Sequence, residues 1–188
     1  MKTKKMNIVS LFWIVGLSWI SLNGASQDIK LSHQERKEAE KAQMAANFYI
    51  LDSLMNARSF VLEADNLQNQ YGDRAFVSSN INFIRVDKSV GVLQTGSDWG
   101  GRGYNGVGGV TAEGNIGTWK VDRDAKKLIY RVQFSLLTNI GYYDVFMVVS
   151  ADGRASATIS GMSRGKLTWD GHLETVNNSR VFKGQNTI

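Results

Sequence analysis

The stretch LIYRVQFSL, residues 128–136, alternates between large apolar and polar side chains from Tyr130 onward. One face of an extended chain would carry Leu128, Tyr130, Val132, Phe134 and Leu136, and the other would carry Arg131, Gln133 and Ser135. A period of two is the side-chain period of a β-strand. Because the two faces differ so cleanly, we expect one to pack in a core and the other to meet water.

The same period recurs from Phe76 to the C-terminus, beginning with a run over residues 76–83. Asp87-Lys88 and Asn139–Gly141 are turn candidates, and Asp152-Gly153 is a strong two-residue hairpin signal. About seven to nine short strands without helices between them form a meander, which has to close or stack to protect its edges. We therefore expect an antiparallel barrel or a two-layer sandwich, and the sequence leaves both open.

Helical spacing precedes these strands. Ser32 and Glu35 match a capping box, and the apolar residues Met44, Phe48, Leu51 and Met55 then follow at helical spacing. We predict a helix over about residues 32–57, with a first half too polar to bury, and strands over about residues 60–184. The fold class is mostly β (α+β), lipocalin-like in outline, with the helix covering an opening or a face.

The N-terminal segment has the three-part layout of a secretory signal. A basic cluster is followed by an apolar run over residues 8–22 and by small residues at 24–26. The apolar run is shorter than the roughly 20 residues of a membrane-spanning helix. We predict a signal peptide over residues 1–26 and a single domain over residues 27–188, exported to the periplasm, the cell surface or the medium, with no membrane span after cleavage. An uncleaved anchor is the alternative.

Composition narrows the choice of partners. The chain has no cysteine, which excludes disulfides and a lipid-modified cysteine. Three of the five net positive charges come from Lys2, Lys4 and Lys5 of the predicted signal. The remainder has no basic stripe interleaved with aromatic residues, so nucleic acid is not an expected partner. A small-molecule or protein partner in the cell envelope is expected instead.

A glycine-rich segment carries the candidate ligand-binding residues Asp98, Trp99, Arg102, Tyr104 and Asn105. Two aromatic rings, a carboxylate, a guanidinium and an amide on one loop suit stacking on, and hydrogen bonding to, a sugar or a peptide. The alternative is that these aromatic residues plug a barrel mouth. Gly101–Gly106 also matches G-x-G-x-x-G, but a strand is predicted to follow where a nucleotide site needs a helix. No cofactor is expected.

The segment Gly161–Gly165 matches the G-x-S-x-G elbow of serine hydrolases, with Asp170 and His172 following in the expected order. An elbow requires a strand that turns into a helix, whereas residues 166–173 have strand alternation. We expect a hairpin turn here and predict no catalytic residues, with a triad of Ser163, His172 and Asp170 as the alternative.

Metal sites and carboxylate catalysis have little support in the sequence. The two histidines are far apart, no cysteine ligand exists, and Asp122–Asp124 lacks the rest of a calcium loop, so no metal is expected. Glycosidase chemistry requires two facing carboxylates. The candidates are Asp65, Glu113, Asp144 and Asp170.

Several segments together resemble a known family: FVLEAD (60–65), SNINF (79–83), NGVGGVT (105–111), VVSADG (148–153) and FKG (182–184). With these motifs the chain resembles the domain of unknown function 4251 family of exported proteins from Bacteroides-type bacteria, over nearly all of the region after the signal. The resemblance implies a periplasmic or surface location and a β-rich fold. It implies no activity, cofactor or catalytic residue.

The function that we expect is a non-catalytic extracytoplasmic binding domain for a small apolar or amphiphilic ligand or for a protein partner. The alternatives are an exported hydrolase and a structural component of an envelope assembly. A core filled by Tyr130, Phe134, Phe146, Met147 and Trp169 would count against the small-molecule version.

Overall fold

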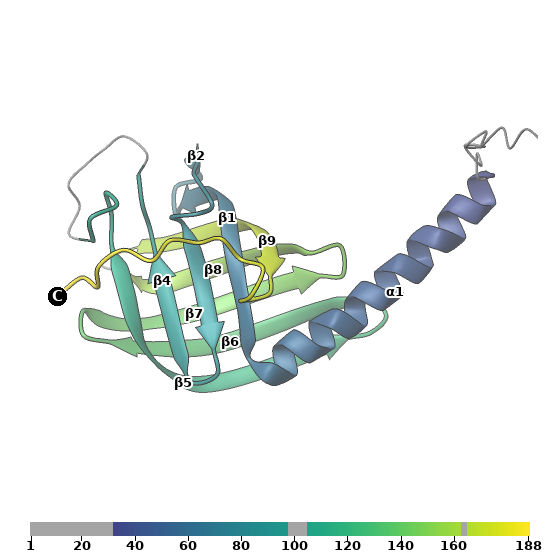
Figure 1. Cartoon of the computed structure of the whole chain (residues 1–188). Helices are drawn as coiled ribbons and strands as arrows, with labels where there is room; N and C mark the ends of the chain where they lie inside the picture. The colour runs from purple at the N-terminus through teal and green to yellow at the C-terminus, as the bar shows by residue number, and fades with distance from the viewer. Residues whose placement is uncertain (1–31, 98–104, 163–164) are drawn as a thin grey trace, which may run out of the picture.

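The computed structural model describes residues 32–97, 105–162 and 165–188, which form one helix and nine strands (Figure 1). These elements are α1 (His33–Ala57), β1 (Ser59–Asn69), β2 (Arg74–Phe76), β3 (Phe83–Asp87), β4 (Val90–Gln94), β5 (Thr111–Asp124), β6 (Ile129–Thr138), β7 (Gly141–Ser150), β8 (Arg154–Met162) and β9 (Gly165–Glu174).

The strands form one antiparallel sheet in the order β2-β1-β3-β4-β5-β6-β7-β8-β9, and a further pairing of β1 with β9 closes it. Strand β1 closes the barrel because its first half pairs with β3 and its residues 61–69 pair with β9. The result is an eight-stranded barrel with β2 attached to β1 as an extra strand. The closed barrel decides between the two architectures that the sequence left open.

The alternation is confirmed from Tyr130 onward in β6, where Tyr130, Val132, Phe134 and Leu136 are buried. Ser135, expected on the wet face, is also buried, and its hydroxyl accepts a hydrogen bond from the Thr118 N–H. Similar inward rows from the other strands fill the barrel, with Trp169, Met147 and Ile159 all fully buried. Of the five residues named above as a possible filling of the core, Phe146 is not part of it, since this side chain is 41% exposed. Phe146 pairs with Gln133, a residue of the outer face of β6, so the inward residues of β7 are its odd-numbered neighbours.

Helix α1 begins as the sequence predicted. The Ser32 N–H donates to Glu35 Oε2 over 2.7 Å, and the Glu35 N–H donates to Ser32 Oγ over 3.3 Å. The buried residues of the helix are Phe48, Leu51 and Met55, all in its second half. Its first half is exposed and stands away from the barrel (Figure 1). No helix within the described ranges is long and apolar enough to cross a membrane.

Two predicted stretches of strand are absent. Residues 77–82 form turns before β3, because the Asn82 side chain donates to Ser78 O and accepts from the Gly96 N–H, and such local bonds compete with a ladder. After β9 ends at Glu174, residues 175–188 run across the barrel as a C-terminal strap (Figure 1). The strap is held by backbone bonds from Phe182 to Asn80 and from Gln185 to Asn105.

Candidate functional site

The candidate site lies at a β-bulge in β1. The pairing with β9 joins Ala64 to Gly171 and Asn66 to Asp170, which leaves Asp65 as an extra residue. On a regular strand Asp65 and Asn66 would point to opposite faces, but both line one groove on the outside of the barrel. Gly171 is required opposite the bulge, because a Cβ there would overlap the carbonyl oxygen of Glu63.

The groove has a volume of about 640 Å³, open to solvent, and draws its lining from β1, β2, β7, β8 and β9. We call it the bulge groove. Its charged and amide side chains are Asp65, Asn66, Arg74, Arg154, Asp170 and His172. Volumes of this order are typical of small-molecule sites.

Asp170 is held from two sides. Arg74 Nη2 donates to Asp170 Oδ2 over 3.0 Å, and Ser156 Oγ donates to Asp170 Oδ1 over 2.6 Å. Across the groove, Arg154 Nε pairs with Asp152 Oδ2 at 2.5 Å. Each of the two Arg side chains of the groove is therefore bound to a carboxylate, of which Asp170 lines the groove and Asp152 does not, and each guanidinium keeps further N–H groups for a ligand.

His172 lies between two carboxylates. Its Nε2 is 3.5 Å from Glu63 Oε2, and its Nδ1 is 3.5 Å from Asp65 Oδ2, so each pair is an ion pair when the imidazole is protonated. Glu63 also accepts a hydrogen bond of 2.6 Å from Ser179 in the C-terminal strap. A carboxylate thus lies near each of the two nitrogen atoms of the imidazole.

The serine-hydrolase geometry is not formed by the described residues. Ser156 bonds the carboxylate of Asp170 directly, whereas a catalytic serine has to contact the imidazole. Ser163 lies outside the described residues. Strand β8 leads to strand β9, and His172 lies at the opposite end of β9 from Gly165. The strand-to-helix context of a nucleophile elbow is therefore missing.

Of the four predicted glycosidase candidates, the structure brings two into the bulge groove, namely Asp65 and Asp170. Asp144 lines a different groove beside Phe146. Glu113 lies against the strap, where hydrogen bonds from Lys183 and then from Asn186 lower the pKa of its carboxyl group. The described part of the chain contains no group of three acidic, histidine or cysteine side chains that could hold a metal ion.

Four of the five predicted ligand-binding residues, Asp98, Trp99, Arg102 and Tyr104, lie outside the described residues. The fifth, Asn105, is 1% exposed. Its amide nitrogen donates to Thr95 O and Thr111 Oγ1, each over 3.0 Å, and its amide oxygen accepts from the backbone N–H groups of Val107 and Gly109. The Asn105 amide is therefore fully engaged within the protein.

Residues 40–173 match the family described as a domain of unknown function, DUF4251. The chain belongs to this family. It is also similar to a crystal structure of a DUF4251 family protein from Bacteroides eggerthii, with 30% sequence identity and a TM-score of 0.61. The match covers 74% of this chain and 96% of that chain. No curated protein matches the chain.

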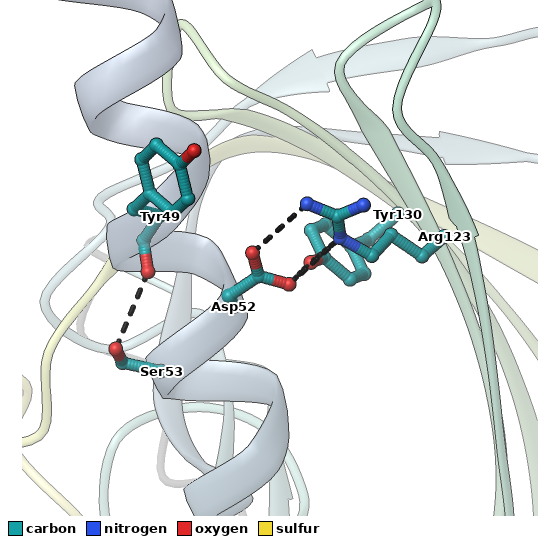
Figure 2. A network of polar contacts seen from close by, with 5 residues as sticks. All are labelled: Tyr49, Asp52, Ser53, Arg123 and Tyr130. Carbon is teal, nitrogen blue, oxygen red and sulfur yellow. Dashed lines mark hydrogen bonds and ion pairs between the residues drawn. The ribbon is translucent and has the colours of Figure 1, made fainter.

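A network that sequence reasoning missed joins the helix of this DUF4251 chain to its barrel (Figure 2). Arg123 donates to both carboxylate oxygens of Asp52, over 2.9 Å and 3.1 Å, and this hydrogen bonding raises the pKa of the guanidinium. The Tyr130 hydroxyl also donates to Asp52. Arg123 lies 4.6 Å from the centre of the Phe48 ring. No local signal could have revealed this contact, because Asp52 and Arg123 are 71 residues apart in sequence.

Proposed function

We propose that this DUF4251 chain is a non-catalytic binding domain of an exported protein, and that its ligand lies in the bulge groove on the outside of the barrel. The observation that carries the proposal is the convergence of two Asp, two Arg, an Asn and a His side chain on one groove of about 640 Å³. A concave site with a few convergent polar groups is the usual form of a small-molecule site.

The filled interior supports a ligand on the outside. Aromatic and aliphatic side chains such as Trp169, Phe60 and Met147 occupy the space that a ligand-holding barrel leaves free. This packing argues against the apolar ligand that the fold class favoured from sequence. The polar lining of the groove calls for a ligand rich in hydrogen-bonding groups.

The arrangement of the acids and bases supports binding without catalysis. Asp170 is engaged by Arg74 and Ser156, and His172 faces two carboxylates rather than a nucleophile. A general acid or base needs a free position beside its substrate and a pKa suited to proton transfer. The proposal of export rests on the signal layout of residues 1–26.

One experiment tests binding at this place. The full chain is expressed in a bacterial host, the protein is purified from the periplasm, and its amide NMR spectrum is recorded with four probes in turn. The probes are cellotetraose, the dipeptide Lys-Glu, succinate and glycerol phosphate. We expect at least one probe to give saturable shifts concentrated on β1, β2, β8 and β9. The proposal is contradicted if neither these four probes nor maltotetraose and chitotetraose show saturable binding.

The same samples test the hydrolase alternative, which is favoured by the presence of Asp65 and Asp170 in one groove. Two carboxyl groups flanking a bond are the machinery of most glycosidases. We expect cellotetraose to remain intact after prolonged incubation. Release of shorter sugars that stops in an Asp170→Asn variant would establish the enzyme and remove the non-catalytic proposal.

A further inference from the structure

We infer that the ligand of the bulge groove is a neutral oligosaccharide. This inference rests on the proposed function and names the chemistry of its ligand. It is carried by the pairing of the two Arg side chains in the groove, by the mixture of donors and acceptors there, and by an exposed aromatic ring on the same face.

Both Arg side chains that line the groove already have a carboxylate partner, while Asp65 faces the His172 imidazole. Two Asp and two Arg side chains contribute, and Arg74 is bound to Asp170 while Arg154 is bound to Asp152. A charged ligand would compete with these counter-ions and leave one of them without its partner. A neutral ligand adds hydrogen bonds to the free N–H groups and lone pairs and leaves the ion pairs intact.

The hydrogen-bonding groups suit hydroxyls. A hydroxyl group donates one hydrogen bond and accepts up to two, so a site for several hydroxyls needs donors beside acceptors. Arg74 stands beside Asp170 on one wall, and His172 stands beside Asp65. The side-chain oxygen of Asn66 is a buried acceptor for which the described residues supply no donor. A ligand hydroxyl that reached it as the groove adjusts would satisfy this atom.

An aromatic ring completes the face. Phe76 is 88% exposed although phenylalanine is strongly apolar. It pairs with groove-lining Asn66 across β1 and β2, and it lies two residues from Arg74, so it is on the same face as the groove. The face of an aromatic ring carries partial negative charge, which suits the polarised C–H groups of a sugar ring.

The shape favours a chain of sugars. The groove lies on the outer side of the sheet and is open to solvent, so it does not enclose a single small ring. A segment of an oligosaccharide can lie along it with one ring against Phe76 and neighbouring rings over the polar walls. The probes are therefore maltotetraose, cellotetraose and chitotetraose, with tetragalacturonate and the dipeptide Lys-Glu as charged comparisons.

The dissociation constants are measured by NMR titration at low and high salt. We expect at least one neutral tetrasaccharide to bind with shifts on β1, β2, β8 and β9. Its Kd should change less than about twofold between about 0.05 M and about 0.5 M NaCl, because a neutral ligand has no charge to screen.

In a Phe76→Ala variant the Kd should rise about threefold to tenfold. The matched control is Tyr71→Ala, which removes a ring that is 82% exposed on the neighbouring turn and should leave the Kd unchanged.

The outcomes separate this inference from the proposed function. Groove binding by a charged probe without any neutral tetrasaccharide would overturn the inference and leave the binding domain standing. Failure of every probe to bind would remove both. Equal losses in the Phe76→Ala and Tyr71→Ala variants would also overturn it, since the effect would then belong to the hairpin rather than to the ring in the groove.

Discussion

Asp52 of α1 and Arg123 of β5 form a two-pronged ion pair that fastens the second half of the helix to the barrel (Figure 2). The pair works with Tyr130, whose ring is buried and whose centroid lies 5.1 Å from that of Phe48 on the helix. Polar and apolar contacts between helix and barrel therefore occur at the same place. The first half of the helix has neither and stands in solvent.

Removing the Tyr130 hydroxyl should loosen the helix. A Tyr130→Phe variant keeps the ring packing but takes a hydrogen bond from Asp52, so we expect the free energy of unfolding to fall by about 1 kcal/mol. Urea unfolding followed by circular dichroism measures this. The control is Tyr142→Phe, at an exposed tyrosine, and it should be neutral. Equal stability of Tyr130→Phe and the wild type would show that the Tyr130 hydroxyl contributes nothing to fastening the helix.

The helix cap should respond to pH. Bonds with Ser32, first from its backbone N–H, lower the pKa of Glu35 below its ordinary value of 4.5. Because the pKa is lower in the folded helix, the carboxylate stabilises the first turn fully above the ordinary value, and this contribution is lost as the pH falls through the lowered value. Amide exchange over residues 33–40, corrected for intrinsic rates, should lose protection in that window. In a Ser32→Ala variant these amides should already have lost protection at neutral pH.

The C-terminal strap should depend on Gly184. A Cβ at this position would overlap the carbonyl oxygen of Asn105, so a Gly184→Ala variant should release the strap and lower the free energy of unfolding by about 1–3 kcal/mol. Thermal unfolding measures the loss of stability, and amide exchange at Gln185 measures the release of the strap. Ile188→Ala, at a fully exposed side chain, is the control and should change neither.

The strap should also loosen in acid. The hydrogen bond from Lys183 lowers the pKa of Glu113 below 4.5, so its stabilising contribution is complete above that value and disappears as the pH falls through the lowered pKa. Amide exchange of Gln185 and Thr187, which donate backbone bonds to the barrel, measures the release. A strap that keeps the same protection through this window would contradict the role of Glu113.

The bulge should require Gly171. An alanine there would collide with backbone rather than with a movable side chain, so we expect a loss of about 2–3 kcal/mol in the free energy of unfolding. Gly165→Ala is the matched control in the same strand, because its Cβ would come no closer than 3.4 Å to the end of the Gln70 side chain. That control should remain within about 0.5 kcal/mol of the wild type. Similar stabilities for the two variants would mean that the bulge tolerates a side chain.

The local elements of the fold can be predicted from short stretches of the sequence. The alternation from Tyr130 to Leu136 is seen in β6, and Ser32 with Glu35 starts the helix. A hairpin forms at Asp152-Gly153 with Gly153 at a φ of 86°, although three residues, 151–153, rather than two connect β7 to β8. Each of these features depends on residues within a few positions of one another. Their physical causes are side-chain period, positive φ and capping, which can all be read without knowing which segments meet.

Closure of the barrel, the bulge groove and the contact of the helix with the barrel depend on how distant segments pack. Closure requires β1 to pair with β9, and the groove requires that pairing to shift register at Asp65. Asp52 meets Arg123 because the helix packs on β5 and β6. These contacts join residues far apart in the chain, and their geometry follows from how whole strands and the helix fit around one filled core. The spacing of residues along the sequence therefore does not predict which strands pair or where the helix packs.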